Sequence, residues 1–253
     1  MILSLEDLLL LDLGCLILHE AHDEDRLVSL RKRIEAEREQ HNPVIVSPYE
    51  DRYLVLDGAH RVRALGELGS RFALVQTVEP PEKAEGWGHL LNGVGRAELD
   101  NIEGIDVSDR LGGAPLAEVE TAGGETFLLS SKEDGLRGRV RALWDLRSFY
   151  PKGVVVRRVE PDGRVHLSGG EALIRYQPFT PGELAEIVYS GSVLPAGITR
   201  FRIQERVLGV RYPLDRMMEG DPRARNAELR EFVESRWEEN RVRYYGEPIV
   251  LFE

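Results

Sequence analysis

The chain has 253 residues, 42% of them hydrophobic and 30% charged, and a formal net charge of -11. This composition is typical of a globular protein, and the length favours two domains of roughly 100 to 200 residues. The acidic balance argues against a general nucleic-acid binder, because such proteins usually present a basic patch or stripe. The single cysteine, Cys15, excludes an intramolecular disulfide and a cysteine-cluster zinc site, and it favours a reducing cytoplasm.

The N-terminal stretch is apolar, but Glu6, Asp7 and Asp12 interrupt it and no basic segment precedes it. We therefore expect neither a signal peptide nor a membrane span, and no membrane partner. The spacing of apolar residues that follows predicts an α+β fold. The expected elements are a short helix over 8–11, a strand over 15–18, a helix over 23–40, strands over 44–46 and 53–56, and a strand over 72–78.

Pro80 and Pro81 mark the predicted domain boundary, because consecutive prolines continue neither a helix nor a strand. We expect one domain over residues 1–82 and a mixed α/β domain over residues 83–253, with a cleft between them. The expected elements of the second domain are strands over 126–129, 153–156, 206–210 and 248–252, and helices over 180–189 and 225–240. Thr180 followed by Pro181 favours a helix start, since proline fits the first helical position.

Residues 52–69 predict a strand, a tight turn at Asp57-Gly58 and a helix that Gly69 ends. A helix N-terminus carries unpaired N–H groups and partial positive charge, and Gly58 would let a phosphate approach the backbone. His60 and Arg61 could donate to the same anion, and Asp57 could hold a metal ion or a substrate hydroxyl. The same residues also fit an ordinary turn with an N-cap, so both interpretations stay open at this point.

Two further segments carry reactive side chains. His19, Glu20 and His22 include good metal ligands, but they lack the helical His-Glu-x-x-His spacing. Glu20, at a predicted strand end, could instead form an acid/base pair with Asp57 across one cleft. Thr199 and Arg200 follow a Pro/Gly turn and suit a carboxylate ligand. The sequence holds no Walker-type motif, no Gly-x-Gly-x-x-Gly and no Gly-x-Ser-x-Gly, so the usual nucleotide folds and the hydrolase elbow lose support.

The turn at residues 57–61, with the strands before it, resembles the ParB/sulfiredoxin superfamily, in which such a turn binds nucleotide phosphates. The resemblance implies that the domain over residues 1–82 is a ParB/sulfiredoxin-like nucleotide-binding domain. Sulfiredoxin has a nucleophilic cysteine where this chain has Ala59, so that chemistry is not expected. Chromosome-partitioning ParB proteins add a Gly-Glu-Arg-Arg type box and a helix-turn-helix domain. This chain shows neither, so we do not expect nucleic acid as a partner.

The chain looks like a third branch, the free L-serine kinases, which comprise the archaeal ADP-dependent and the SbnI-like ATP-dependent enzymes. The segments that carry the resemblance, in the same order, are the His19-Glu20 loop, the turn at 57–61, residues 87–90 and residues 194–200. Phe201 stands where the family commonly has histidine, which puts any role of that imidazole in doubt.

The resemblance implies that a serine hydroxyl attacks the terminal phosphoryl group of ATP or ADP to give O-phospho-L-serine. Glu20 would be the general base, and Asp57 would support catalysis at the phosphates through Mg²⁺. The residues implied in nucleotide binding are Asp57, Gly58, His60 and Arg61, and those implied in serine binding are Trp87, His89, Thr199 and Arg200. A non-enzymatic ParB-like nucleotide-binding regulator is the alternative. The sequence decides neither the donor nucleotide nor the oligomeric state.

Overall fold

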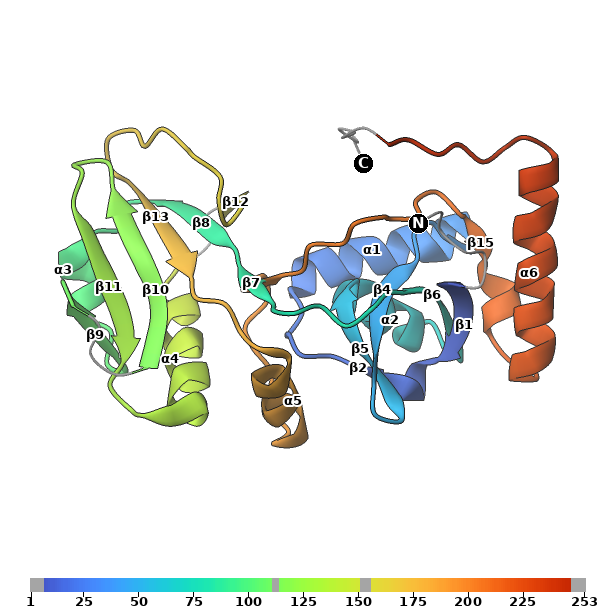
Figure 1. Ribbon diagram of the computed structural model, residues 1–253, viewed down its shortest axis with the longest axis horizontal. Helices are drawn as coiled ribbons and strands as arrows, with labels where there is room; N and C mark the ends of the chain where they lie inside the picture. The colour runs from blue at the N-terminus through green and yellow to red at the C-terminus, as the bar shows by residue number, and fades with distance from the viewer. Residues whose placement is uncertain (1–6, 111–113, 151–155, 247–253) are drawn as a thin grey trace.

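The structure is a computed structural model that describes residues 7–110, 114–150 and 156–246 (Figure 1). Within these ranges the chain forms a mixed α/β fold with six α-helices and two main β-sheets. Each main sheet and its helices make one lobe, and the two lobes lie side by side along the long axis of the molecule (Figure 1).

The first lobe is built on a five-stranded sheet with the order β1-β6-β4-β5-β2. Its strands are β1 (Leu8–Asp12), β2 (Leu16–Ile17), β4 (Val44–Tyr49), β5 (Arg52–Asp57) and β6 (Phe72–Thr77). The sheet is mixed: β6 with β4 and β5 with β2 are parallel, and the other two pairs are antiparallel. The helices of this lobe are α1 (Glu24–Glu37), α2 (Ala59–Glu67) and α6 (Pro222–Glu238) (Figure 1). Leu27, Val62 and Leu74 lie in the hydrophobic core that these elements share.

The second lobe is built on a six-stranded antiparallel sheet with the order β12-β8-β13-β10-β11-β9. Its strands are β8 (Gly88–Asn92), β9 (Ile105–Ser108), β10 (Ala114–Thr121), β11 (Thr126–Ser131), β12 (Arg157–Val159) and β13 (Glu171–Tyr176). Its helices are α3 (Arg96–Asp100), α4 (Gly135–Phe149) and α5 (Pro181–Tyr189). Thr180 caps α5 in a capping box with Glu183, as the Thr-Pro signal predicts.

After α5 the chain returns to the first lobe. Strand β14 (Thr199–Arg200) pairs with β7 (Glu85–Gly86), and β15 (Tyr212–Pro213) pairs with β3 (Glu39–Gln40). Two short 3-10 helices, Leu13–Cys15 and Leu214–Met217, lie in the connections of the first lobe. Helix α6 then covers β1, where the Asn226 side chain exchanges two hydrogen bonds with the backbone of Leu10. Helix α6, near the end of the chain, thus packs on the first sheet. The domain boundary after residue 82 stays a prediction.

Several predicted elements are confirmed. The helix over 23–40, the hairpin strands and the strand over 72–78 correspond to α1, β4, β5 and β6. The helices over 180–189 and 225–240 correspond to α5 and α6, and the strand over 126–129 corresponds to β11. The predicted strand over 15–18 shrinks to Leu16–Ile17 after a 3-10 turn. The strand over 248–252, and residues 153–155 of the one over 153–156, lie outside the described residues.

Two predicted elements are wrong, and α4 was not predicted. The helix expected over 8–11 is strand β1, because the edge of β6 offers backbone partners that outweigh the local capping signal. The strand expected over 206–210 has no strand partner within the described residues. The amide of buried Gln76 binds this segment instead, accepting from Val207 N at 2.9 Å and donating to Glu205 O at 2.9 Å.

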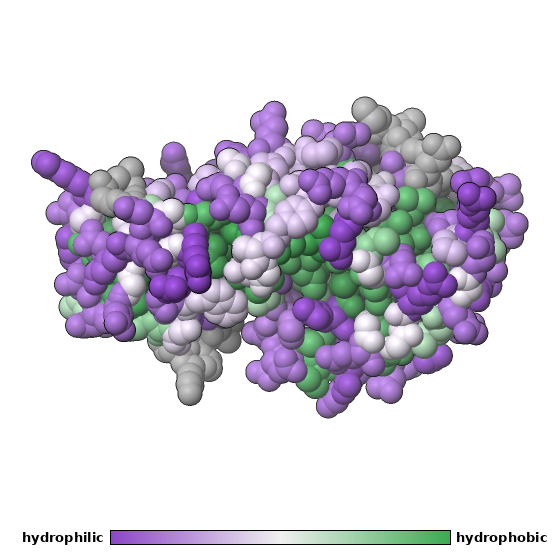
Figure 2. All heavy atoms as spheres, turned by 90° about the horizontal axis from the view of Figure 1, so that it is seen from below, coloured by the Kyte–Doolittle hydropathy of each residue, from purple (hydrophilic) through white to green (hydrophobic). Residues whose placement is uncertain are grey.

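Figure 2 shows hydrophilic side chains over much of one face, with hydrophobic residues visible between them. This distribution is consistent with a chain in which 30% of the residues are charged. Among the described helices, none combines the length and the apolar character that crossing a membrane would require.

We predict that Gln40→Ala destabilises the first lobe. Gln40 is fully buried. Its side-chain amide donates to Leu74 O at 2.7 Å and accepts from Leu74 N at 3.0 Å. These two bonds extend the backbone pairing between β4 and β6 by one position. Loss of the amide would leave two buried backbone groups of β6 unpaired, at about 1–3 kcal/mol each. Urea unfolding should therefore show a loss of roughly 2–4 kcal/mol. Glu35→Ala, at an exposed position of α1, is the control, and equal stability of the two variants would contradict this account.

Candidate active site

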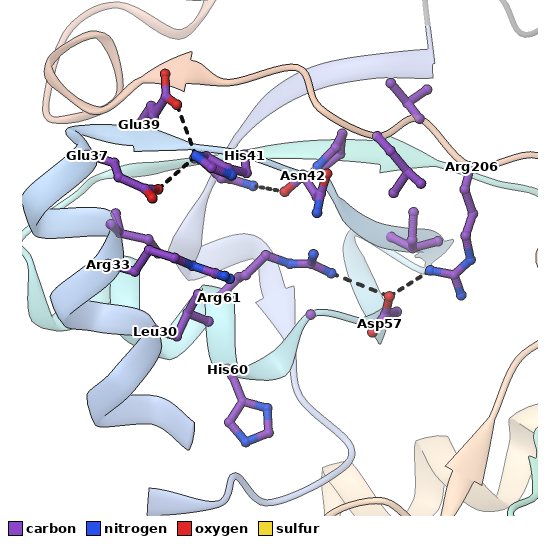
Figure 3. A pocket seen from close by; sticks show the side chains of 17 residues that line it. Leu30, Arg33, Glu37, Glu39, His41, Asn42, Asp57, His60, Arg61 and Arg206 are labelled. Atoms are coloured by element: carbon purple, nitrogen blue, oxygen red, sulfur yellow. Dashed lines mark hydrogen bonds and ion pairs between the residues drawn. The ribbon is translucent and has the colours of Figure 1, made fainter. Parts of the chain in front are cut away.

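Two neighbouring cavities, each of about 310 Å³, lie beside the turn between β5 and α2. The first, the α1 pocket, is lined by α1, by the segment that follows it and by residues 206–208 (Figure 3). The second, the interlobe pocket, is lined by both lobes, among others by Glu20, Trp87 and Thr199. The residues that line both are Asp57, Gly58, His60 and Arg206. The predicted turn therefore lies where two cavities of small-molecule size meet.

Gly58 is required at this turn. Its φ of +108° lies in the left-handed region, and a Cβ would lie 2.8 Å from the guanidinium of Arg61. No side chain caps the N-terminus of α2 at Gly58, so the first N–H groups of this helix are not used by a capping residue. The helix start thus offers the kind of anion site that the sequence predicts.

Asp57 ends β5 and meets two arginines (Figure 3). Its Oδ2 accepts a hydrogen bond from Arg206 Nη1 at 2.7 Å and lies 3.4 Å from Arg61 Nη2. Burial raises the pKa of Asp57, but the positive charges of Arg61 and Arg206 outweigh burial and hold the pKa below its ordinary value. Asp57 is therefore an ionised carboxylate at neutral pH, and Arg61 lines only the α1 pocket.

His60 is neutral at neutral pH, because burial and the charge of Arg26 lower its pKa. Its Nε2 accepts from the backbone N–H of Asp23 at 2.9 Å, so the proton of the neutral ring lies on Nδ1. His60 thus ties α2 to the start of α1 and keeps one donor.

Glu20 is held by three donors from the segment around residues 197–199. Gly197 N donates to Oε2 at 2.9 Å, and the N–H and hydroxyl of Thr199 each donate to Oε1 at 2.6 Å. Backbone hydrogen bonds with Leu194 on either side of Glu20 place its backbone as well. A carboxylate can accept about four hydrogen bonds, so Glu20 keeps acceptor capacity on Oε2.

His19 supports this arrangement from behind. The Thr199 hydroxyl donates to Glu20 and therefore accepts from His19 Nε2, at 2.8 Å. His19 is buried, and burial lowers its pKa, so the ring is neutral with its proton on Nε2. Phe201 packs edge-on against the His19 ring with centroids 5.5 Å apart. Phe201 also lines the interlobe pocket.

His89 does not line either pocket. It is 2% exposed, and its Nε2 donates to Gly197 O at 2.8 Å, so its Nδ1, 3.1 Å from Tyr150 Oη, accepts the Tyr150 proton. Tyr176 donates in turn to Tyr150 at 2.5 Å, which completes a buried chain of hydrogen bonds. The structure thus places His89 behind the loop that holds Glu20, and not among the pocket residues.

Trp87 and Arg200, two of the residues that the resemblance implies in serine binding, both line the interlobe pocket. The Arg200 guanidinium lies 5.2 Å from the centre of the Trp87 ring and forms an ion pair with Glu160 at 2.6 Å. Three further pocket arginines, Arg26, Arg158 and Arg206, were not predicted. Arg206 lies in a segment that shares the family resemblance, but no site role was expected for it; Arg26 and Arg158 lie in charged stretches that no motif marks.

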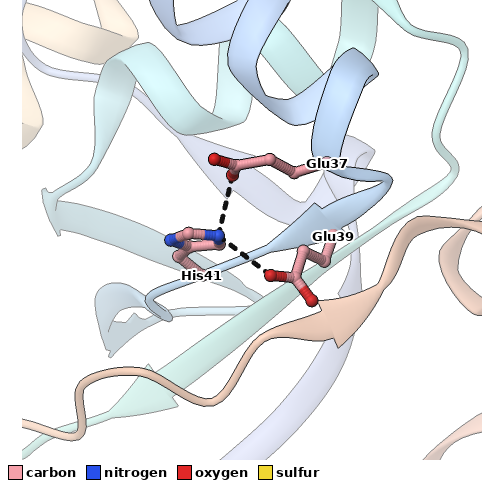
Figure 4. Close-up of side chains that lie close together, drawn as sticks. All are labelled: Glu37, Glu39 and His41. Carbon is pink, nitrogen blue, oxygen red and sulfur yellow. Dashed lines mark ion pairs between the residues drawn. The ribbon is translucent and has the colours of Figure 1, made fainter.

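The predicted metal ligands His19, Glu20 and His22 do not converge. His22 pairs with Glu24 at 3.4 Å, away from the Glu20 carboxylate and its donors. Within the described part of the chain, the group whose ligand atoms converge is Glu37, Glu39 and His41, at the edge of the α1 pocket (Figure 4). His41 Nε2 lies 2.7 Å from Glu37 and 3.0 Å from Glu39, a geometry that ion pairing explains.

We predict that His89 makes stability depend on pH. Burial lowers the pKa of His89 to about 4, whereas an unfolded histidine titrates near 6.5. Between these values the unfolded chain binds more protons, so the free energy of unfolding falls as the pH falls. From pH 7 to 4.5 this residue should account for a loss of roughly 2–3 kcal/mol. Urea unfolding of His89→Gln should show a correspondingly smaller loss than the wild type. His166→Gln, at an exposed position, should reproduce the wild-type slope, and an unchanged slope in His89→Gln would contradict the prediction.

Comparison with known proteins gives relatives over the whole chain, although no family model matches. The chain is 26% identical to the ATP-dependent L-serine kinase SbnI of Staphylococcus aureus, over 98% of each chain. It is 30% identical to an ATP-dependent L-serine kinase of Staphylothermus marinus, over 49% of this chain and 52% of that protein.

Solved structures show the same fold. A C-terminally truncated SbnI from Staphylococcus aureus superposes with a TM-score of 0.77 at 24% identity, over 92% of this chain and 98% of that one. A free serine kinase in complex with AMP superposes with a TM-score of 0.59 at 20% identity, over 83% of this chain and 93% of that one. The resemblance is therefore confirmed: along nearly its whole length, the chain is similar to the SbnI-like free L-serine kinases.

Proposed function

We propose that this protein is a free L-serine kinase, a phosphotransferase that uses ATP to convert L-serine into O-phospho-L-serine. Two relatives with that activity in their names, one similar along the whole chain, support it. The observation that carries the proposal is that Glu20, in an isolated bridge with Leu194, and Asp57, at the end of β5, line one pocket between the lobes. ATP is the proposed donor because both relatives are named ATP-dependent.

The two cavities suit two substrates. We place the nucleoside in the α1 pocket and the phosphates at Gly58, His60 and the start of α2, where N–H groups and partial positive charge favour anions. Arg61 and Arg206 add guanidinium donors at the same junction. Serine then occupies the interlobe pocket, beside Trp87, Thr199 and Arg200.

Glu20 is proposed as the general base that takes the proton of the serine hydroxyl. The donors from Gly197 and Thr199 fix its carboxylate in one orientation, so it needs no rearrangement when serine arrives. The remaining acceptor capacity on Oε2 can receive the proton. His89 acts through Gly197, whose carbonyl it binds, and is proposed as a positioning residue.

Mg²⁺ is the proposed metal, and Asp57 fits it. Magnesium in such sites is held by one or two carboxylates together with substrate phosphates. Asp57 is an ionised carboxylate at the phosphate end of the pockets, and both arginines contact its Oδ2, which leaves Oδ1 to serve as ligand. The ion would supply charge neutralisation on the phosphates.

We further propose that the first lobe is the ParB/sulfiredoxin-like domain and that the interlobe pocket is the cleft of a two-domain cytoplasmic enzyme. The strand, turn and helix at residues 52–67 support the first point. Residues of both lobes around one pocket support the second.

We predict that Glu20→Gln and Asp57→Asn each lower the rate of O-phosphoserine formation by about a hundredfold or more, because the first removes the base and the second a charge at the phosphates. The assay combines L-serine, Mg²⁺ and either ATP or ADP. Glu79→Gln, at an exposed position outside both pockets, is the matched control and should keep wild-type activity.

The outcomes separate the candidate functions. A wild-type protein that binds nucleotide but forms no O-phosphoserine with either donor would favour the non-enzymatic regulator. Full activity of both variants would leave the kinase in place but remove the proposed roles of Glu20 and Asp57.

A further inference from the structure

Arg158, an exposed arginine on β12 of the second lobe, lines the interlobe pocket. Its guanidinium carbon lies 5.8 Å from the centre of the Trp87 ring. Its Nη2 approaches Gly197 so closely that a Cβ there would lie 2.4 Å away, which the φ of +80° at Gly197 also disfavours. An aromatic ring and a bare backbone therefore border the guanidinium at the wall of the interlobe pocket.

The arginines that line this pocket differ in whether they form ion pairs. Four arginines line it, and two of them, Arg200 and Arg206, form ion pairs with carboxylates. Arg158 and Arg26 form no ion pair with any residue that the structure describes. Arg26 belongs to α1 of the first lobe, so two unpaired cations from different lobes face one cavity. Like charges in this arrangement are stabilised when an anion lies between them.

Arg158 is also within electrostatic reach of both proposed catalytic carboxylates. Burial and the charge of Arg26 lower the pKa of Arg158, and the charges of Glu20 and Asp57 act in the opposite sense. An anion bound by Arg158 would lie in the pocket that Glu20 and Asp57 also line. In a phosphoryl transfer, this is the space that the transferred group crosses.

We propose that Arg158, with Arg26 opposite, binds the phosphoryl group while it is transferred. The inference rests on the proposed kinase function. In the step, the serine oxygen forms a bond to the terminal phosphorus and its proton passes to Glu20. The bond from that phosphorus to the bridging oxygen breaks, and its electron pair leaves with ADP. The planar guanidinium of Arg158 contacts two of the non-bridging oxygens that carry the charge.

Kinetics with Arg158 variants provide the first test. Arg158→Ala should lower kcat for O-phosphoserine formation by about a hundredfold or more, with a much smaller change in the KM for serine. Arg158→Lys should recover only part of the rate, since an ammonium keeps the charge but lacks the two-pronged geometry. Arg157→Ala is the matched control, because Arg157 is the adjacent arginine of β12 and is exposed like Arg158 but lines neither pocket; it should leave kcat unchanged. Thermal unfolding of each variant establishes that it is folded.

Titrations identify which anion Arg158 binds. If it binds the phosphoryl group, Arg158→Ala should weaken the binding of O-phospho-L-serine at least tenfold and change the binding of L-serine less than twofold. If it binds the serine carboxylate instead, both ligands weaken alike and the proposal is overturned. Wild-type kcat in a folded Arg158→Ala variant overturns it as well. A wild-type protein that makes no O-phosphoserine removes the proposed function, and this inference with it.

Discussion

The site depends on the hydrogen bonds that hold the Glu20 carboxylate. Its donors, Gly197 N–H and the N–H and hydroxyl of Thr199, belong to a segment almost 180 residues further along the chain. Two buried histidines secure that segment: His19 donates to the Thr199 hydroxyl and His89 donates to the Gly197 carbonyl. Both rings are neutral because burial disfavours their charged forms, so their proton positions are set by the partners they contact. The orientation of the proposed base is therefore a property of the whole fold.

Two side-chain amides make hydrogen bonds that replace backbone pairing where the chain returns to the first lobe. Gln76 binds the backbone of the returning segment at Glu205 and Val207, and Gln40 joins β3, the partner of β15, to the backbone of Leu74. The first of these contacts places Arg206 beside Asp57, at the junction of the two pockets. A segment without regular strand pairing can thus deliver a charged side chain to a defined place, because its buried polar groups still find partners.

The elements that the sequence predicts well are those with strong local signals. The hairpin of β4 and β5, the helix α1 after Asp23, and the capping box at Thr180 follow from periodicity and capping chemistry. The prediction of a helix over residues 8–11 was wrong, because β6 offers hydrogen-bond partners to the same backbone groups that the capping pattern would place in a helix. The role of His89 could not be predicted either. The resemblance implied serine binding for His89, whereas its hydrogen bonds with Tyr150 and Gly197 make it a support for Gly197.

By itself, the sequence determined the turn at Asp57 to Arg61, since a strand end, a glycine with positive φ and a helix start are all local features. Together with the order of four short motifs, it also pointed to the free L-serine kinases. Only the tertiary structure decided which cations face the pocket. No local pattern predicts a site role for Arg26, Arg158 or Arg206, and they line one pocket with Glu20 and Asp57 only because distant segments of the chain meet there. Charge acts through space, so a charged site assembled from distant segments becomes visible only after the chain has folded.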